Sequence, residues 1–403
     1  MSHIVVVGAG QAGAALVARL RTDGFDGRIT LIGEEHVPPY QRPPLSKAYL
    51  MGEMALERLF LRPESFYAEN GIDLHLDETV VAIDRADKVV VAGDRSIPYD
   101  QLALTTGSVP RRLSGAIGGE LRGVHVVRTL ADVDAMAPDM AAGRRVLIVG
   151  GGYIGLEAAA ICVKRGMEVT LIEMAERILQ RVACPETSAY FRDLHRAHGV
   201  DIREGVGLTC LNAADHHVTG AILTDMTEPP FDMVIAGIGI SPATSLAEAA
   251  GLEIDNGIKV DARGRTSDPA IWSAGDCASF PYRGHRIRLE SVQNAIDQAE
   301  LVARNMMGAD EPYDPHPWFW SDQYDVKLQI AGLNTGYDRV VVRGGADAAL
   351  SHWYYAGTRL LAVDAMNDPR AYMVGKRLLE AGKSPADELV ADTGTDLKTL
   401  LRA

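Results

Sequence analysis

The sequence predicts an α/β fold built on two separate βαβ units, followed by a small α+β region at the C-terminus. Two glycine-rich turns, beginning at Gly8 and Gly150, each follow an apolar strand pattern and open a helix pattern. Beyond Pro317 the chain changes to short segments in which apolar and polar residues alternate. A chain of 403 residues is also too long for one ordinary core, so two or three domains are expected.

Composition and charge narrow the class of protein. Hydrophobic residues make up 47% and charged residues 23%, as in ordinary globular domains. The net charge of −14 opposes nucleic acid as a partner, because phosphate binding needs a positive field. The chain starts without a basic region or a small-residue cleavage site, and no apolar stretch reaches the roughly 20 residues that span a bilayer. We therefore expect a cytoplasmic protein that does not enter the membrane.

The first βαβ unit is predicted from a strand, a helix and a strand: Ile4–Val7, Gln11–Arg21 and Ile29–Ile32. Between the first two lies a GxGxxG turn made by Gly8, Gly10 and Gly13. In such a turn the first glycine makes the tight bend, the second lets backbone N–H groups approach a pyrophosphate, and the third allows close helix packing. Glu34 follows the next strand, where a carboxylate accepts hydrogen bonds from ribose hydroxyls. The unit is therefore predicted to bind a dinucleotide.

The second βαβ unit repeats this pattern in Arg145–Val149, Tyr153–Lys164 and Glu168–Ile172. Its turn contains Gly150, Gly152 and Gly155, and Glu173 ends the next strand. A carboxylate at Glu173 would repel a 2′-phosphate, so NAD is favoured over NADP. We interpret Arg177 as a solvated charge at a turn, and a swing toward the ribose is the alternative.

The rest of the chain suggests a return to the first domain and then a third one. Strand-like runs follow the first unit at Asp73–Leu76, Val80–Ile83, Lys88–Val91 and Gln101–Leu104. A strand ending in the turn at Asp276, and a helix pattern from Ser291 to Met306, suggest the return. The tail holds strand patterns at Val326–Ile330, Val340–Val342, Trp353–Tyr355 and Leu360–Val363, then two short helix-like runs. We predict Rossmann-like domains over 1–113 with 247–317 and over 114–246, and an α+β domain over 318–403.

Two dinucleotides in one chain suggest an electron relay from nicotinamide to flavin, in which the cofactors carry the chemistry. The four cysteines are widely spaced and none lies between Glu34 and Leu50: Cys162, Cys184, Cys210 and Cys277. A disulfide or peroxide reductase is therefore disfavoured, and no metal-ligand cluster is predicted.

Further segments carry a family resemblance. Arg42–Lys47, Ser273–Asp276 and Trp318–Gln323, taken with the two glycine turns, resemble the ferredoxin reductases of bacterial oxygenase systems. Within these, the segments resemble the putidaredoxin reductase and rhodocoxin reductase type, which serves cytochrome P450 systems, and the resemblance covers essentially the whole chain. It implies a glutathione-reductase-like arrangement of the two Rossmann-like domains. It also implies FAD at the first turn, NADH at the second, and a [2Fe–2S] ferredoxin as electron acceptor.

The resemblance also implies cofactor contacts for individual residues. Those expected at FAD are Gly8, Gly10, Ala12, Gly13, Glu34, Arg42, Lys47, Val80, Arg128, Asp276 and Val292. Those expected at NADH are Gly150, Gly152, Ile154, Gly155, Glu173 and Gly239. Asp276 matches the acid that holds the ribityl chain, and Val292 matches a backbone contact at the pyrimidine edge of the flavin. A helix that begins near Ser291 would place its positive end there, where negative charge develops on reduction.

Three residues match positions of catalytic importance in the family: Lys47, Glu157 and Trp320. Lys47 and Glu157 resemble a charge pair near the flavin, and Trp320 resembles an indole close to both cofactors. The alternatives are a surface lysine, an exposed helix face for Glu157, although its neighbours are apolar, and hydrophobic packing for Trp320.

Two other functions stay open at this point: an NADH-dependent quinone or monodehydroascorbate-type reductase, and an NADH-sensing flavoprotein of the apoptosis-inducing type. A ferredoxin would need a basic docking surface, for which the candidates are Arg62, Arg286, Arg288 and Lys327.

Overall fold

The structure, a computed structural model, describes residues 2–345 and 349–402, which form two compact units. Unit 1 comprises the chain up to Arg42, Met54–Val109 and Ile240–Pro315. Unit 2 comprises Pro43–Glu53, Pro110–Gly239 and the chain from His316 onward. Each unit is described by itself below. The division into three domains at 113, 246 and 317 stays a prediction.

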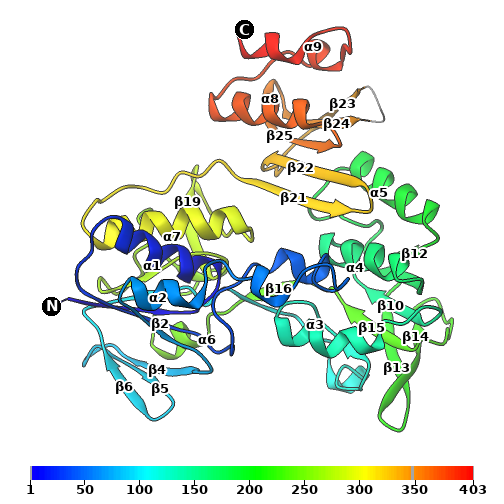
Figure 1. Ribbon diagram of the computed structural model, residues 1–403. Helices are drawn as coiled ribbons and strands as arrows, with labels where there is room; N and C mark the ends of the chain where they lie inside the picture. Colours follow the sequence, from blue (N-terminus) through cyan, green and yellow to red (C-terminus); the bar gives the residue numbers. More distant parts are fainter. Residues whose placement is uncertain (1, 346–348, 403) are drawn as a thin grey trace. The chain divides into compact units, whose positions relative to one another are not determined.

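Unit 1 is built around a parallel sheet in the order β18-β7-β1-β2-β3. Its strands are β1 (His3–Val7), β2 (Arg28–Ile32), β3 (Ile72–His75), β7 (Gln101–Leu104) and β18 (Ile271–Ser273). Figure 1 shows α1 (Gln11–Thr22) and α7 (Val292–Met306) side by side. Leu16 and Val302, one from each helix, are fully buried in the same core cluster. The chain therefore returns to the first sheet, as the sequence predicted.

Smaller elements complete unit 1. An antiparallel sheet contains β4 (Val80–Asp84), β5 (Val89–Ala92) and β6 (Arg95–Pro98), and a three-stranded sheet contains β17 (Ile258–Lys259), β19 (Ala278–Tyr282) and β20 (His285–Ile287). The short helices are α2 (Glu64–Glu69), α6 (Ser245–Ala249) and η2 (Leu56–Arg58), and β8 (Ser108–Pro110) pairs with β16 (Ile240–Pro242). Lys88, which was expected to start a strand, has a φ of 52° and forms the turn before β5.

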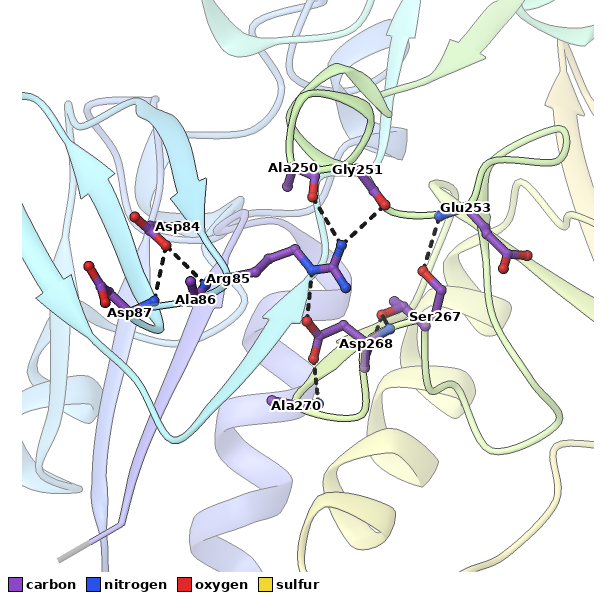
Figure 2. Close-up of polar contacts among 11 residues, drawn as sticks. Asp84, Arg85, Ala86, Asp87, Ala250, Gly251, Glu253, Ser267, Asp268 and Ala270 are labelled. Atoms are coloured by element: carbon purple, nitrogen blue, oxygen red, sulfur yellow. Dashed lines mark hydrogen bonds and ion pairs between the residues drawn. The ribbon is translucent and has the colours of Figure 1, made fainter.

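Arg85 ties the β4–β5–β6 sheet to the rest of unit 1 (Figure 2). Its Nε donates to Asp268 Oδ2 over 2.7 Å, and its Nη1 donates to the carbonyls of Ala250 at 3.3 Å and Gly251 at 3.2 Å. Those carbonyls lie at the end of α6, where a cation is favourable. The contacts fix the sheet that carries Val80 on β4.

Unit 2 contains a second parallel sheet in the order β12-β11-β10-β15-β9. Its strands are β9 (Val124–His125), β10 (Arg145–Val149), β11 (Glu168–Glu173), β12 (Asp201–Glu204) and β15 (Met233–Ala236). The other elements are η1 (Pro43–Ser46), η3 (Gly115–Ile117), α3 (Leu130–Met136), η4 (Ala137–Asp139), α4 (Tyr153–Lys164), α5 (Pro185–Ala197) and the hairpin of β13 (Leu208–Ala214) and β14 (His217–Leu223). Val149 pairs with Ile172 just as Val7 pairs with Ile32 in unit 1, which confirms the repeated βαβ unit.

The C-terminal part of unit 2 is an antiparallel sheet in the order β21-β22-β25-β24-β23. Its strands are β21 (Trp318–Gln323), β22 (Val326–Gly332), β23 (Arg339–Gly344), β24 (Leu350–Ala356) and β25 (Arg359–Met366). The helices are α8 (Pro369–Glu380), α9 (Asp387–Ala391) and η5 (Leu397–Leu401), so the helical part is longer than the two short runs expected. Helix α8 buries Leu378 against Val363 and Trp353 of the sheet. Within the described residues, no helix has the length and apolar character needed to cross a membrane.

Candidate functional site

The first glycine turn is shaped by backbone packing at two of its three glycines. Gly8 has a φ of 111°, and a Cβ there would lie 2.3 Å from the carbonyl oxygen of Thr105. A Cβ on Gly13 would lie 2.1 Å from the carbonyl oxygen of Gly8. A Cβ on Gly10 would meet no protein atom within 4 Å. The first and third glycines are therefore needed for the fold, whereas the second borders open space at the start of α1.

The second turn has the same construction. Gly150 has a φ of 107°, and a Cβ there would lie 2.4 Å from the carbonyl oxygen of Gly237. A Cβ on Gly155 would lie 2.0 Å from the carbonyl oxygen of Gly150, and one on Gly152 would meet nothing within 4 Å. Ile154, in the first turn of α4, is 47% exposed although it is apolar. An exposed apolar side chain beside an open glycine is suited to contact a bound cofactor.

Both helix N-termini have the properties of an anion site. Gly10 and Gly152 occupy the N-cap positions of α1 and α4, and neither provides a side-chain hydrogen bond to the cap. The first turn of each helix contains no acidic residue. The positive ends of the two helix dipoles and their free N–H groups therefore fit dinucleotide phosphates.

The two carboxylates predicted to bind ribose hydroxyls, Glu34 and Glu173, differ in their surroundings. By strand register Glu173 is equivalent to Gly33, and Glu34 lies one residue further along and is exposed. Glu173 Oε2 accepts the N–H of Gly151 over 2.7 Å, and its Oε1 accepts the N–H of Ala175 over 2.8 Å. Each of these oxygens keeps a second lone pair for a ribose hydroxyl. The hydrogen bonds fix Glu173 beside the second glycine turn.

The interpretation of Arg177 as a solvated charge is wrong. The side chain is half-buried, and its Nη1 donates to the carbonyl of Cys184 over 3.3 Å and also to the hydroxyl of Ser188. A second guanidinium nitrogen donates to the carbonyl of Gln180. The guanidinium thus cross-links the segment between β11 and α5, adding a donor to the Cys184 carbonyl, which also accepts the N–H of Ser188.

In unit 1 the turn that carries Asp276 packs on the start of α1. Gly275 has a φ of 84°, and a Cβ there would lie 3.0 Å from the Cβ of Ala12 and 3.8 Å from that of Ala295 near the start of α7. Asp276 is half-buried, and its Oδ2 accepts the hydroxyl of Ser108 over 2.9 Å. Sequence reasoning did not identify Ser108. The structure therefore gathers Ala12, Asp276 and the start of α7.

The N-terminus of α7 is capped by its own sequence. The Ser291 hydroxyl accepts the N–H of Asn294 over 3.1 Å, and Val292 is the first residue of the helix. A serine at the N-cap stabilises a helix start by about 1 kcal/mol. The helix therefore begins where the sequence predicted, with its positive end close to the Asp276 turn.

Arg42 is held by an acid that sequence reasoning also missed. Its Nη2 lies 2.7 Å from Glu35 Oε1, and its Nη1 donates to the hydroxyl of Tyr40 over 3.0 Å. Tyr40 in turn donates to Glu35 Oε2 over 2.6 Å. Arg42 belongs to unit 1 whereas Lys47, five residues later, belongs to unit 2. The Arg42–Lys47 segment therefore passes from one unit to the other.

The remaining predicted contacts lie in different parts of the chain. Val80 is half-buried on β4 of unit 1, and Arg128 is half-buried between β9 and α3 of unit 2. Gly239 of unit 2 has a φ of 96°, which glycine adopts without strain. The residues that follow it form β16.

Lys47 and Glu157 form an ion pair within unit 2. Lys47 Nζ lies 3.3 Å from Glu157 Oε1 and 3.2 Å from Asp322 Oδ2. Glu157 is buried, with 6% of its surface exposed, so it is not on an exposed helix face. Ser321 donates to Glu157 Oε1 over 2.7 Å, and Ser46 donates to its Oε2 over 3.2 Å. Burial raises the pKa of Glu157, and the Lys47 charge and the serine hydrogen bonds limit that rise.

The pattern of β21 explains why Ser321 reaches Glu157. Side chains alternate along a strand, so Phe319, Ser321 and Gln323 share one face and Trp318, Trp320 and Asp322 share the other. On the first face the Phe319 ring lies 5.1 Å from that of Tyr153 at the start of α4. On the second face the half-buried ring of Trp320 lies 5.6 Å from that of Trp318. The alternation was a usable signal for Ser321 and Asp322.

The four basic residues proposed for ferredoxin docking differ in their exposure and in their contacts within the protein. The Arg288 side chain is 10% exposed and lies 2.6 Å from Glu290. Arg286 donates to the carbonyl of Val260 over 3.0 Å. Arg62 lies over the Phe66 ring, and Lys327 is exposed. Arg286 and Arg288 therefore support the fold of unit 1, so their interpretation as docking residues is weakened.

Comparison with known proteins identifies the family. Residues 2–299 match the pyridine nucleotide-disulphide oxidoreductase family. The chain belongs to this family. Residues 318–401 match the reductase C-terminal family. The two matches together confirm the predicted Rossmann-like fold followed by an α+β region, and FAD and NADH are the cofactors of this chain.

Members of the family resemble this chain over nearly its full length. A ferredoxin–NAD(P)+ reductase of Sphingomonas sp. is 46% identical over 94% of this chain and 92% of its own length. Putidaredoxin reductase of Pseudomonas putida is 41% identical over 100% of this chain and 97% of its own length. A crystal structure of the covalent putidaredoxin reductase–putidaredoxin complex matches with a TM-score of 0.96 and 41% identity, covering 100% of this chain and 98% of the matched one. The resemblance predicted from the sequence is confirmed.

Proposed function

We propose that this oxidoreductase takes a hydride from NADH and passes single electrons to a [2Fe–2S] ferredoxin that serves a cytochrome P450 or another oxygenase. The observation that carries the proposal is the presence of two dinucleotide turns of identical construction in one chain. The near full-length similarity to proteins named ferredoxin and putidaredoxin reductase supports the choice of acceptor. FAD, when bound, accepts two electrons as hydride and releases them singly, as a cluster requires.

The residues of unit 1 would bind FAD. The N–H groups at Gly10 would hold the pyrophosphate, and the exposed carboxylate of Glu34 would accept ribose hydroxyls. Asp276, oriented by Ser108, would hold the ribityl chain. The positive end of α7 at Val292 would stabilise negative charge on the pyrimidine edge of the flavin. Each of these roles needs only side chains and backbone groups that unit 1 already holds in place.

The residues of unit 2 would bind NADH and orient it. The turn at Gly152 would hold its pyrophosphate, and Glu173 would accept the hydroxyls of its adenosine ribose. The Lys47–Glu157 pair would supply a fixed dipole beside the bound nicotinamide, and Trp320 would cover the nicotinamide with an indole ring. Fixed charges of this kind cost no reorganisation during the reaction.

Thiol chemistry at the three buried cysteines does not compete with this proposal. All four cysteines are free, and Cys162, Cys184 and Cys277 are buried. Burial raises the pKa of Cys162 to about 12. Nucleophilic thiols are partly exposed and have a lowered pKa. Free thiols also fit a reducing compartment, which supports our proposal that the enzyme works in the cytoplasm.

The test is NADH oxidation by the FAD-loaded protein with a set of acceptors. We expect a [2Fe–2S] ferredoxin to be reduced directly and to increase cytochrome c reduction at least tenfold, with NADH preferred to NADPH. A quinone offered under the same conditions would be a poorer acceptor. If the ferredoxin is not reduced while the quinone is, the proposed acceptor is wrong and the quinone reductase alternative replaces it.

A further inference from the structure

A continuous chain of hydrogen bonds runs through the interior of unit 2 from Tyr324 to Glu157. We propose that Gln323 and His195 are positioning residues that hold Glu157 as a carboxylate facing Lys47, through hydrogen-bond donors that all point toward Glu157. The consequence for catalysis rests on the proposed function, because that function places Glu157 at the NADH site. We call the four residues Tyr324, His195, Gln323 and Ser321 the donor chain.

The donor chain is continuous over four contacts. Tyr324 Oη lies 3.2 Å from His195 Nδ1, and His195 Nε2 lies 2.8 Å from Gln323 Oε1. Gln323 Nε2 donates to Ser321 Oγ over 3.2 Å, and Ser321 donates to Glu157 Oε1 over 2.7 Å. His195, Gln323 and Ser321 are fully buried. Water therefore does not replace these partners in the folded protein.

The direction of the donors follows from the chemistry of each group. Glu157 as a carboxylate only accepts, so the Ser321 hydroxyl donates to it and is left to accept from the Gln323 amide N–H. The Gln323 carbonyl oxygen then accepts, so His195 carries its proton on Nε2. His195 Nδ1 is left as an acceptor for the hydroxyl of Tyr324. One assignment thus satisfies every member, and it ends on a negative charge.

A neutral imidazole is required for this assignment. Burial lowers the pKa of His195 to about 4, although its hydrogen bond to Gln323 acts to raise the pKa. His198 stacks on the Tyr324 ring, with 3.7 Å between ring centroids, and its charge also lowers the pKa of His195. His195 is therefore neutral over the physiological range and donates through one nitrogen only.

Glu157 needs these hydrogen-bond donors because Lys47, the cation beside it, also pairs with Asp322. The groups that face Glu157 are Lys47, Ser46 and Ser321, and Lys47 is also 3.2 Å from Asp322. Asp322 has 43% of its side chain exposed, so water stabilises its charge, whereas the Glu157 side chain is 7% exposed. A carboxylate in such a buried place persists only with hydrogen bonds to its charged form. Successive donors polarise one another and strengthen the last bond.

The experiment measures the protonation of Glu157 directly in the FAD-loaded full-length protein. The infrared carbonyl band of the protonated acid is titrated against pH and assigned by its absence in Glu157→Gln. We expect Ser321→Ala and Gln323→Leu to raise the midpoint by about one pH unit, or roughly tenfold in the proton affinity, because each removes donor support from the carboxylate. His195→Phe should give a smaller rise and Tyr324→Phe the smallest.

Two matched variants separate this role from general loosening of the core. Ser321→Thr keeps the hydroxyl and should show the same midpoint as the parent protein. This comparison remains possible even if Gln323→Leu or His195→Phe fails to fold. Ser351→Ala removes an equally buried serine, which accepts from Trp353 Nε1 and has no link to Glu157, and should leave the midpoint unchanged. An unchanged midpoint in both Ser321→Ala and Gln323→Leu, or an equal rise in Ser351→Ala, overturns the proposal. A raised midpoint in a protein that reduces no ferredoxin supports the donor chain and refutes only the proposed function.

Discussion

Lys47 Nζ lies 3.3 Å from Oε1 of Glu157, and this pair joins the segment after η1 to the middle of α4. The Glu157 side chain is 7% exposed, and that of Lys47 is 21% exposed. Breaking such a pair by removing one partner leaves an uncompensated charge in a poorly solvated place. The effect of breaking the pair on hydride transfer can be measured separately from its effect on the stability of the fold.

Lys47→Met retains the length of the side chain and removes its charge. We expect the rate of hydride transfer from NADH, followed by stopped-flow absorbance of FAD, to fall by about tenfold or more, because loss of the Lys47 charge raises the pKa of Glu157 further and removes the ion pair. Lys164→Met is the control, since Lys164 pairs with Glu53 on the surface and both side chains are more than half exposed. That variant should stay within about twofold of the parent protein. Equal losses in the two variants would refute a special role for Lys47.

The open and packed glycines of the second turn should respond differently to alanine. Gly152→Ala should leave the melting temperature nearly unchanged but raise the Kd for NADH by about tenfold, because its Cβ enters only the space left for the pyrophosphate. Gly155→Ala should destabilise the protein by about 2 kcal/mol or more, because its Cβ would lie 2.0 Å from a carbonyl oxygen. Calorimetry of unfolding and of NADH binding distinguishes the two. A stable Gly155→Ala protein would contradict this account of the turn.

Glu173 should determine the preference for NADH. Glu173→Gln keeps an acceptor for the N–H of Gly151 but removes the charge that repels a 2′-phosphate. We expect the ratio of kcat/KM for NADH to that for NADPH to fall by about tenfold. Glu168→Gln, at the exposed start of the same strand, provides the control and should leave the ratio unchanged. An unchanged ratio in Glu173→Gln would exclude this carboxylate as the determinant.

Two buried histidines should make the protein less stable in acid. Burial lowers the pKa of His195 and of His352 to about 4, below the unfolded value of 6.5. The unfolded chain therefore binds more protons, and the free energy of unfolding should decrease as the pH falls from 6.5 to 4, by up to about 3 kcal/mol for each histidine. Urea unfolding across that range measures the slope, and His352→Gln should reduce it. An equal slope in His352→Gln would contradict the assignment.

The raised pKa of Asp364 has the opposite effect on the pH dependence of stability, so this residue provides a second test of the same argument. Burial raises its pKa to about 6, whereas hydrogen bonds from Tyr354 and Thr187 oppose that rise. A raised pKa contributes stability below the unfolded value of 3.8 that is lost as the pH rises through about 6. Asp364→Asn removes this contribution, so the loss of stability on acidification should become steeper than in the parent protein.

The sequence by itself determined the two βαβ units, because each rests on local information. A buried strand, a glycine turn and a helix pattern lie within some 30 residues, and the clashes that require Gly13 and Gly155 involve the carbonyls of Gly8 and Gly150 in the same turns. The start of α7 is equally local, because Ser291 caps its own helix. The family, its fold and its cofactors followed from such segments.

Only the tertiary structure decided which side chains surround Glu157. Its partners come from η1 and the residue after it, and from β21, and the donor chain adds α5, so no short pattern in the sequence joins them. The same reason explains the missed partner Ser108, which lies far from Asp276 in the sequence. Glu35 lies only seven residues from Arg42, but no regular spacing predicts that the chain between them brings the two side chains together. The partners of Arg177 are close to it in the sequence, but only the folded loop before α5 brings their carbonyls within hydrogen-bond distance of the guanidinium. Ion pairs and buried hydrogen bonds depend on distance in space, which strand alternation and glycine spacing do not specify.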